Sequence, residues 1–383
     1  MFSNKYKITK YLIPAFLVVL YVTYAGLKLA NAQHEVHTDS TAIVTGTETG
    51  ATTHSEVSHE ESATEHKPEK VDAGKLIMEH IGDSYDWHIV TIGHTHVSIP
   101  LPLIIKDDKG LHVFLSNKFH HGHEAYEGYE LKEGKLINLS GADFLDLSIT
   151  KNVFAMFVAV IVLLIIMLSI AGSYKSNALK APKGIQAFVE PLIIFIRDEV
   201  AKPSIGKQYN RFMPFLLTIF FFIFINNIFG LIPLFPGGAN VTGNIAVTMV
   251  LAAFTFVITM INGNKNYWSH IFMPPGVPGW LLPLMIPIEI IGVLNKPIVL
   301  TIRLFANITA GHIIILGFFS LIFIFAEMNT GLGFGVSAFS VAFTTFMSFL
   351  ELLVAFLQAY VFTLLSAIYF GSAVEEHHHE EHH

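Results

Sequence analysis

Residues 281–326 read "LLPLMIPIEIIGVLNKPIVLTIRLFANITAGHIIILGFFSLIFIFA", an almost unbroken apolar stretch. As one helix rising about 1.5 Å per residue it would be roughly 69 Å long, whereas the hydrocarbon core of a bilayer is about 30 Å thick. The apolar stretch 336–370 would likewise reach roughly 52 Å. Each stretch must fold into a re-entrant pair or cross at a steep tilt, and we expect one strongly tilted pass for each.

The composition of the whole chain also indicates an integral membrane protein. Hydrophobic residues make up 52% of the sequence and charged residues only 14%, so several apolar runs can span a bilayer. The sequence has no cysteine, which excludes disulfides, thiolate catalysis and thiolate metal sites. The net charge of −7 comes mostly from hydrophilic terminal segments, so we expect no nucleic-acid partner.

Residues 1–32 have the pattern of a secretory signal peptide. A start with three lysines precedes an apolar middle, and the small residues Ala30-Asn31-Ala32 precede Gln33. The alternative is an uncleaved anchor helix over 11–30, which is long enough to span. Either interpretation places the chain from residue 34 onward outside the cytoplasm.

Three histidine-rich segments surround or follow the spans. Residues 33–70 are rich in His, Glu and Thr with little to bury, which predicts disorder. Residues 71–150 form a predicted extracytoplasmic region, with strand-like alternation and a turn at Asp108-Lys109-Gly110 that indicate a β-hairpin. The histidines at 33–70, 119–124 and in the acidic tail 373–383 could chelate metal. We favour solvated segments, because no fixed spacing holds these histidines on one face.

Five spans are expected in an all-α membrane domain at 151–372. Three are ordinary spans at 153–172, 212–232 and 243–261, and the two long stretches complete the set. The loop after the first span is rich in Lys and Arg, so the positive-inside rule makes it cytoplasmic. Within it, 184–200 is typical of an interfacial helix. Turn-rich segments at 262–280 and 327–335 precede and separate the two long stretches.

Arg303 lies within the first long stretch. A guanidinium does not lose its proton at accessible pH, and placing it at a bilayer centre costs at least ~2.5 kcal/mol. On an ideal helix, one stripe within about 60° contains Glu289, Lys296, Arg303, Asn307 and Ala310. Since Glu289 is about 21 Å from Arg303 along the helix, we expect a carboxylate on another subunit to be the partner of Arg303.

His312 lies about 180° from Arg303 around the same helix and should face the last helix of its own chain. That helix carries a second polar stripe at spacings of three and four, formed by Thr344, Ser348, Glu351, Ala355 and Gln358. A His312–Glu351 pair could hold or pass a proton, or could simply be a satisfied hydrogen bond between helices. Glu289 and Lys296 lie near the cytoplasmic end, where their side chains could also reach water.

Three motifs together are specific to one family. They are "FINNIFGLIP" at 224–233, "KPIVLTIRLFANITAGH" at 296–312 and "FLELLVAFLQAYVFTLLSAIY" at 349–369. In this order they closely resemble subunit a of the F-type ATP synthase, the stator half of a rotary proton channel. The resemblance covers roughly residues 145–370.

The resemblance implies a non-catalytic subunit with two half-channels that meet a rotating ring of c subunits. Arg303 would face the ring's ion-binding carboxylate, accompanied by Asn307. His312, Glu351 and Gln358 would belong to the outer half-channel. Glu289 matches a position linked to the cytoplasmic side. Asn227 and Thr248 match polar positions on the two preceding helices.

The implied partners are the c-ring, the subunit b stalk, the remaining F0 and F1 subunits and membrane lipid, with no cofactor and no metal. The implied location is a bacterial inner membrane, with the mature N-terminus outside and the C-terminus in the cytoplasm.

Two features depart from the usual bacterial pattern. His312 stands where some members have Glu, and Glu351 stands where those have His, which preserves an acid–imidazole pair with the positions exchanged. The exported N-terminal region is also larger than usual. The His–Glu pair favours H⁺ over Na⁺, because imidazole titrates near neutrality. A standalone transporter would need inverted repeats and a site within one chain, and an intramembrane enzyme would need a catalytic constellation; the sequence contains neither.

Overall fold

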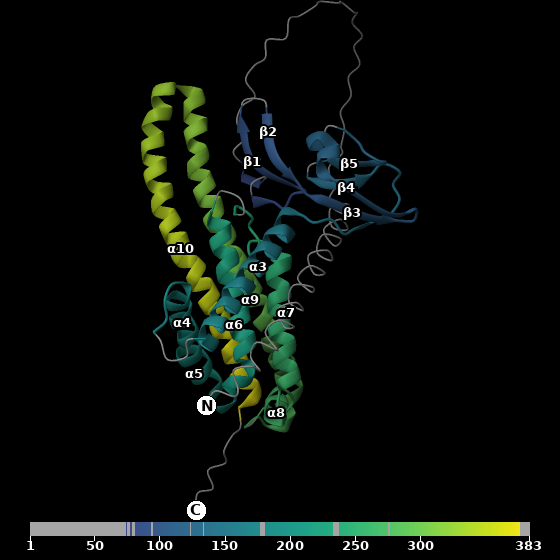
Figure 1. The fold of residues 1–383 in the computed structure, drawn as a ribbon. Coiled ribbons are helices and arrows are strands. Elements are labelled where there is room, and N and C mark those ends of the chain that lie inside the picture. Colours follow the sequence, from purple (N-terminus) through teal and green to yellow (C-terminus); the bar gives the residue numbers. More distant parts are fainter. Residues whose placement is uncertain are drawn as a thin grey trace, which may run out of the picture.

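The computed structural model describes residues 81–375 except 93–94, 123, 133, 177–180, 233–236 and 275, together with residues 74, 77 and 78. The predicted signal peptide at 1–32, the segment 33–70 and the tail residues 376–383 lie outside the described residues. A helical bundle makes up most of the described molecule, and a β region, residues 86–146, lies beside its upper half (Figure 1).

Within the described residues, five helical segments are long and apolar enough to cross a membrane, as predicted, and all five lie in the bundle. The second of these runs over 185–231 and includes the segment that we expected to be a separate interfacial helix. The helices, in chain order, are α3 (Lys151–Ser176), α4 (Ile185–Phe195), α5 (Lys202–Ile205), α6 (Tyr209–Leu231), α7 (Ile245–Asn262), α8 (Lys265–Phe272), α9 (Leu282–Met328) and α10 (Thr330–Val374). Short 3-10 turns precede α6 and α9, and a π turn at 196–201 joins α4 to α5.

Helices α9 and α10 are each continuous, so neither long stretch folds into a re-entrant pair. They contain 47 and 45 residues, and they lie side by side as a hairpin (Figure 1). The predicted separator at 327–335 is wrong for most of its length, because only Asn329 interrupts the helices. Its side chain accepts a hydrogen bond from the Gly331 amide at 2.7 Å and starts α10, so the following glycines are helical.

A second difference concerns 262–280, which the sequence predicts to be turn-rich. Residues 265–272 form α8, because the Asn264 side chain accepts a hydrogen bond from the Tyr267 amide at 2.8 Å. The buried Tyr267 and Ile271 then hold this short helix against the bundle.

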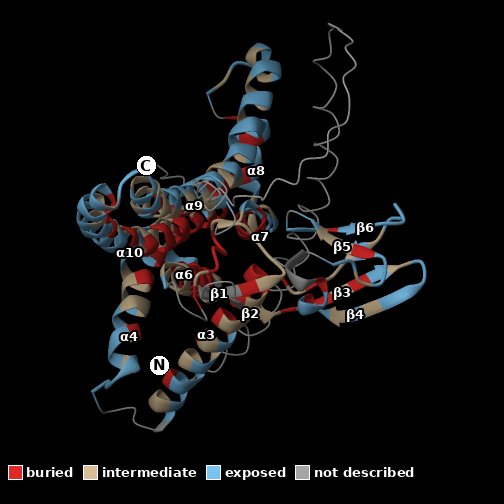
Figure 2. Ribbon diagram, turned by 90° about the horizontal axis from the view of Figure 1, so that it is seen from above, coloured by how far each residue is buried: buried red, intermediate tan, exposed pale blue. Residues whose placement is uncertain are grey.

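Helix α6 lies at the centre of the bundle. Buried residues gather where α6, α9 and α10 meet (Figure 2). Phe212 at the start of α6 stacks on Phe370 of α10 with ring centroids 4.8 Å apart. One residue further on, Gly371 has no space for a Cβ atom, because the Ser204 carbonyl of α5 occupies that position. The end of α10 is therefore held tightly against both segments.

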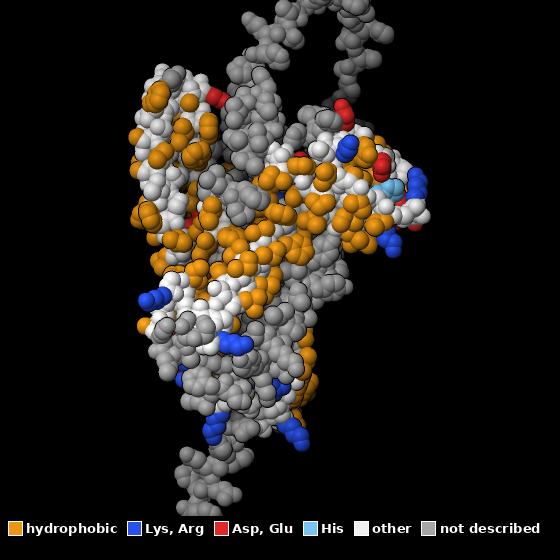
Figure 3. All heavy atoms as spheres, in the orientation of Figure 1, with side chains coloured by type: hydrophobic (Ala, Val, Ile, Leu, Met, Phe, Trp, Pro, Cys, Tyr) orange, Lys and Arg blue, Asp and Glu red, His pale blue; other side chains and the backbone are white. Residues whose placement is uncertain are grey.

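The outer surface of the bundle is mainly hydrophobic, and Lys and Arg side chains gather in its lower half, away from the β region (Figure 3). This distribution follows from the sequence, because the described basic residues between the first two ordinary spans lie near helix ends. They are Lys175, Lys183, Arg197, Lys202, Lys207 and Arg211.

Three small antiparallel sheets make up the β region. β1 (Asp86–Ile92) pairs with β2 (Thr95–Pro100), and β5 (Tyr129–Lys132) pairs with β6 (Lys135–Asn138). The third sheet has the order β4-β3-β7, from Gly110–Leu115, Pro102–Asp107 and Leu145–Asp146. Asp107 pairs with Gly110, so the β3–β4 turn lies at the predicted position. The Asp107 carboxylate accepts hydrogen bonds from the Lys109 and Gly110 amides, which closes the turn.

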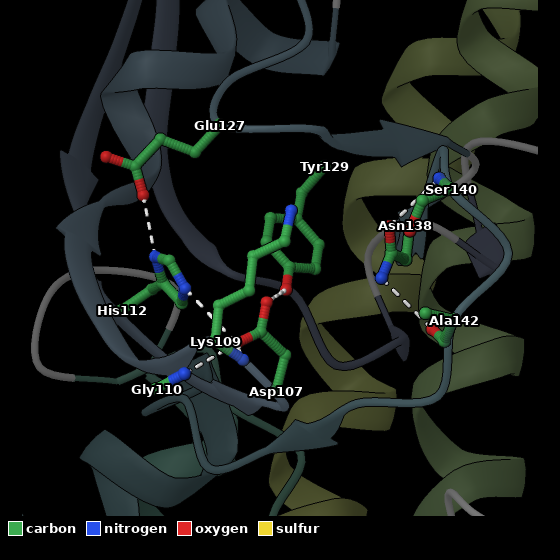
Figure 4. A network of polar contacts seen from close by, with 9 residues as sticks. All are labelled: Asp107, Lys109, Gly110, His112, Glu127, Tyr129, Asn138, Ser140 and Ala142. Carbon is green, nitrogen blue, oxygen red and sulfur yellow. Dashed lines mark hydrogen bonds and ion pairs between the residues drawn. The ribbon is translucent and has the colours of Figure 1, made fainter.

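A polar network crosses the β region beside this turn (Figure 4). His112 lies between two carboxylates, 3.3 Å from Asp107 and 3.0 Å from Glu127. The Tyr129 hydroxyl donates to Asp107 at 2.9 Å. Burial, with the Asp107 carboxylate, raises the pKa of Tyr129 to about 12. Desolvation acts to raise the pKa of Asp107, but hydrogen bonds from Tyr129 and two backbone amides outweigh it and lower that pKa.

Candidate functional site

Arg303 lies on the exposed face of α9. Ala306, Asn307 and Ala310 are exposed on the same face, while Leu300 and Leu304 on the other side are buried in the bundle. Within the described part of the chain, the guanidinium makes no hydrogen bond and no ion pair. No carboxylate among the described residues therefore pairs with Arg303.

Gln358 of α10 lies beside Arg303. The two side chains line one shallow groove between α9 and α10, whose remaining walls are aliphatic and aromatic. Gln358 is 8% exposed, so its amide is held close to the helix surface rather than projecting from it. The small residues around Arg303 leave the guanidinium open to an approaching helix, because alanine side chains add little bulk.

His312 points to the opposite side of α9, as the helical wheel predicted, and contacts Glu351 of α10. Its Nδ1 atom lies 2.6 Å from Oε1 of Glu351, and the two side chains are 13% and 5% exposed. Gly311 makes this contact possible, since a Cβ atom there would lie 2.7 Å from the same carboxylate oxygen. The pair thus connects the two long helices inside the bundle.

A backbone carbonyl completes this pair. Nε2 of His312 lies 3.3 Å from the Gly230 carbonyl of α6, which can only accept a hydrogen bond. With a proton on Nε2 the imidazole donates to this carbonyl, and one proton shared between Nδ1 and Glu351 accounts for their 2.6 Å separation. This proton belongs to His312 in one form and to Glu351 in the other, so the pair can exchange a proton with little movement.

Asn227 lies three residues before Gly230 on α6 and is 2% exposed. It donates to the Ala355 carbonyl of α10 at 3.0 Å and accepts a hydrogen bond from Thr242 at 2.6 Å. The amide thereby fixes α10 one turn beyond Glu351. The sequence analysis did not identify Gly230, Gly311 or Thr242 as site residues. The available signal was that Gly230 lies three residues after Asn227, and therefore on the same face of α6.

The other predicted residues lie apart from this pair. Thr248 of α7 is buried, and its hydroxyl donates to the Ile245 carbonyl of its own helix at 3.0 Å. Glu289 is half-buried on α9 and forms no ion pair within the described residues. Lys296 lies over the Tyr369 ring, 5.2 Å from its centroid, rather than pairing with Glu289. The structure therefore brings together Asn227, His312 and Glu351 inside the bundle, and Arg303 and Gln358 at its surface.

Comparison with known proteins gives two family matches. Residues 153–371 match the model of the ATP synthase A chain, and residues 76–152 match a domain of unknown function. The boundary between them falls at the start of α3, where the β region ends and the bundle begins.

Curated relatives match over more than half of the chain. The chain is 46% identical over 243 residues to ATP synthase subunit a of Chloroherpeton thalassium, an alignment that covers 62% of this chain and 69% of the relative. It is 47% identical over 247 residues to ATP synthase subunit a 2 of Chlorobaculum tepidum, covering 63% and 67%. With ATP synthase subunit a of Myxococcus xanthus it shares 44% identity over 246 residues, covering 62% and 77%.

Proposed function

Because the chain belongs to the ATP synthase subunit a family, we propose that it is the stator subunit that forms two proton half-channels against a rotating c-ring. In this role it couples proton flow to rotation and to ATP synthesis without catalysing a reaction itself. The observation that carries the proposal is Arg303, an exposed cation on the apolar surface of α9 that forms no ion pair with any described residue.

Arg303 supplies the barrier between the half-channels. A guanidinium keeps its charge, so an ionised carboxylate of the ring is attracted to it and a protonated one gains nothing from it. A ring site must therefore release its proton to a half-channel before it passes Arg303. A unit charge that moves through 100 mV releases about 2.3 kcal/mol, and this barrier prevents that energy from being lost as a leak.

The His312–Glu351 pair supplies a proton-holding group on the outer half-channel. The proton between its two heavy atoms can move from imidazole to carboxylate over a short path. Gln358 adds a polar group on the side of Arg303 and the ring, and Asn227 adds one on α6. Thr248 and Glu289 would line other parts of the two paths. We propose H⁺ as the coupling ion, because imidazole exchanges protons near neutral pH and is a poor ligand for Na⁺.

The distribution of positive charge supports the proposed orientation in a bacterial inner membrane. The lower half of the bundle, with its Lys and Arg residues, would face the cytoplasm, and the β region would lie outside (Figure 3). The proposed partners are the c-ring, the subunit b stalk and the remaining F0 and F1 subunits. A standalone transporter is disfavoured, since Arg303 has no counter-charge among the described residues of its own chain.

The test uses the purified complex in proteoliposomes. Arg303→Ala should abolish ATP synthesis driven by a proton gradient, while the complex still assembles. Arg303→Lys should fail as well, because lysine can lose its proton and cannot spread its charge over a planar group. Arg211→Ala, an exposed arginine at the start of α6, is the matched control and should retain activity. Wild-type synthesis by Arg303→Ala would overturn the proposal.

A sodium gradient imposed on the same vesicles tests the coupling ion. Synthesis driven by sodium in the absence of a proton gradient would contradict the assignment of H⁺.

A further inference from the structure

The sheet β4-β3-β7 is apolar on both faces. Its inner face contributes the fully buried Leu103 and Ile105 to the core of the β region. The pairing of Ile104 with Val113 and of Lys106 with both Leu111 and Leu145 defines the opposite face. This outer face consists of Pro102, Ile104, Lys106, Leu111, Val113, Leu115 and Leu145.

The outer face is largely uncovered. Leu111, Val113 and Leu145 are 63%, 62% and 53% exposed, and Leu115 is 45% exposed. A sheet with one solvated face normally alternates apolar residues inside with polar residues outside. Here Lys106 is the single polar residue of the outer face, so the sequence of these strands indicates that something apolar covers it.

The sheet is fixed close to the point where the chain enters the membrane domain. Only residues 147–150 separate β7 from α3. Two of them extend the pairing with β3, as Leu147 donates to the Ile104 carbonyl at 2.7 Å and Ile149 to the Pro102 carbonyl at 3.0 Å. The first α3 residue, Lys151, donates from its backbone to the Ser84 carbonyl at 2.8 Å. These bonds hold the sheet against the first turn of the span.

The apolar surface of the β region adjoins that of the helices. Figure 3 shows hydrophobic side chains on the side of the β region that lies nearest the bundle, and they continue onto the helices below. On α3, Ile161, Ile165 and Leu168 are exposed on a helix that is long and apolar enough to cross a membrane. The two surfaces form one continuous hydrophobic area.

We propose that the outer face of the β4-β3-β7 sheet rests in the interfacial layer of the bilayer, on the leaflet that α3 enters at Lys151. Leu111, Val113 and Leu115 would lie among the upper acyl chains, and Lys106 would extend to lipid phosphates. A lipid surface fits better than a protein partner because the exposed residues are aliphatic, whereas protein interfaces are enriched in aromatic residues and Arg. The proposal concerns residues that take no part in the proton path.

The absence of cysteine from the sequence gives a direct test. Val113→Cys carries the only thiol of this subunit and can be labelled with an environment-sensitive fluorophore in the assembled complex. The complex is placed in lipid nanodiscs with and without phosphatidylcholine that bears a nitroxide near its headgroup. Lys135→Cys on β6, an exposed residue across the core from the outer face, is the matched control.

We expect blue-shifted emission at position 113 and loss of most of it with the nitroxide lipid, while the control stays bright. Leu111→Cys should behave like Val113→Cys and serves if the first variant fails to assemble. A probe at 113 that stays bright and is quenched by water-soluble iodide would overturn the proposal. A blue-shifted probe that nitroxide lipid does not quench would also overturn it, because a protein would then cover the face. ATP synthesis by each labelled complex shows separately whether the proton path is intact.

Discussion

Gly311→Ala should reduce proton-driven ATP synthesis without disturbing the fold. The added Cβ atom would lie 2.7 Å from Oε1 and 3.1 Å from Cδ of Glu351, and ordinary contacts begin at 3.4 Å. The carboxylate must therefore retreat by about 0.7 Å, which lengthens the 2.6 Å contact with His312 to as much as about 3.3 Å. That length is outside the range of charge-assisted hydrogen bonds. A misplacement of this size lowers a rate on the order of tenfold or more.

The assay is the rate of ATP synthesis by the complex in proteoliposomes, together with passive proton conduction after the F1 sector is removed. Gly317→Ala is the matched control, because it lies on the same helix and a Cβ atom there meets nothing within 4 Å. In a Glu351→Gln background, Gly311→Ala should have no further effect, since it acts through that carboxylate. An unchanged rate for the single variant Gly311→Ala would refute the reasoning.

Three further predictions concern stability. Burial raises the pKa of Asp83, whose carboxylate accepts a hydrogen bond from the first turn of α3. The folding stability that depends on this carboxyl group therefore declines as pH rises through its pKa. Thermal-melting curves of Asp83→Asn at several pH values should show no such decline. Asp83→Ala should lower the stability by about 1 kcal/mol, because it also removes the hydrogen bond that caps α3. Tyr129 has a pKa of about 12 against an ordinary value of 10.0. Its contribution to folding stability should therefore be complete below pH 10 and be lost as pH rises through about 12. Absorbance titration of the protein, compared with Tyr129→Phe, measures this pKa. Gly371→Ala should lower the melting temperature of the complex, because backbone of Ser204 fills the required space and overpacking costs about 1–3 kcal/mol; an unchanged melting temperature would contradict it.

Helical periodicity predicted the candidate site well because the geometry of an α-helix is nearly fixed. The opposite directions of Arg303 and His312, and the contact from His312 to Glu351, required only 100° per residue and two neighbouring helices. Hydropathy likewise predicted five spans, since length and charge decide whether a helix can cross a bilayer.

What the sequence did not predict depends on backbone and on caps. The Gly230 carbonyl is a partner of His312, but a carbonyl has no signature in a sequence and its position depends on how α6 packs. The sequence pattern predicts that Asn264 and Asn329 lie in turns, whereas each begins a helix through its side chain. Among the glycines after Asn329, Gly333 packs closely on Ala326, where a Cβ atom would lie only 2.8 Å away, and this packing offsets its low helix propensity.

The single non-helical residue at the tip of the α9–α10 hairpin restricts how the length of this chain can vary. Most surface connections absorb insertions and deletions, because flexible residues take up the change. Here Asn329 leaves no such residues, so one residue added between His312 and Glu351 would turn one side chain about 100° away from the other. Apart from Asn329, which starts α10, and Gly333, which packs on Ala326, the tip should therefore accept replacements of its residues but no change in their number. The proton-holding pair then depends on the number of residues in a segment far from the pair itself.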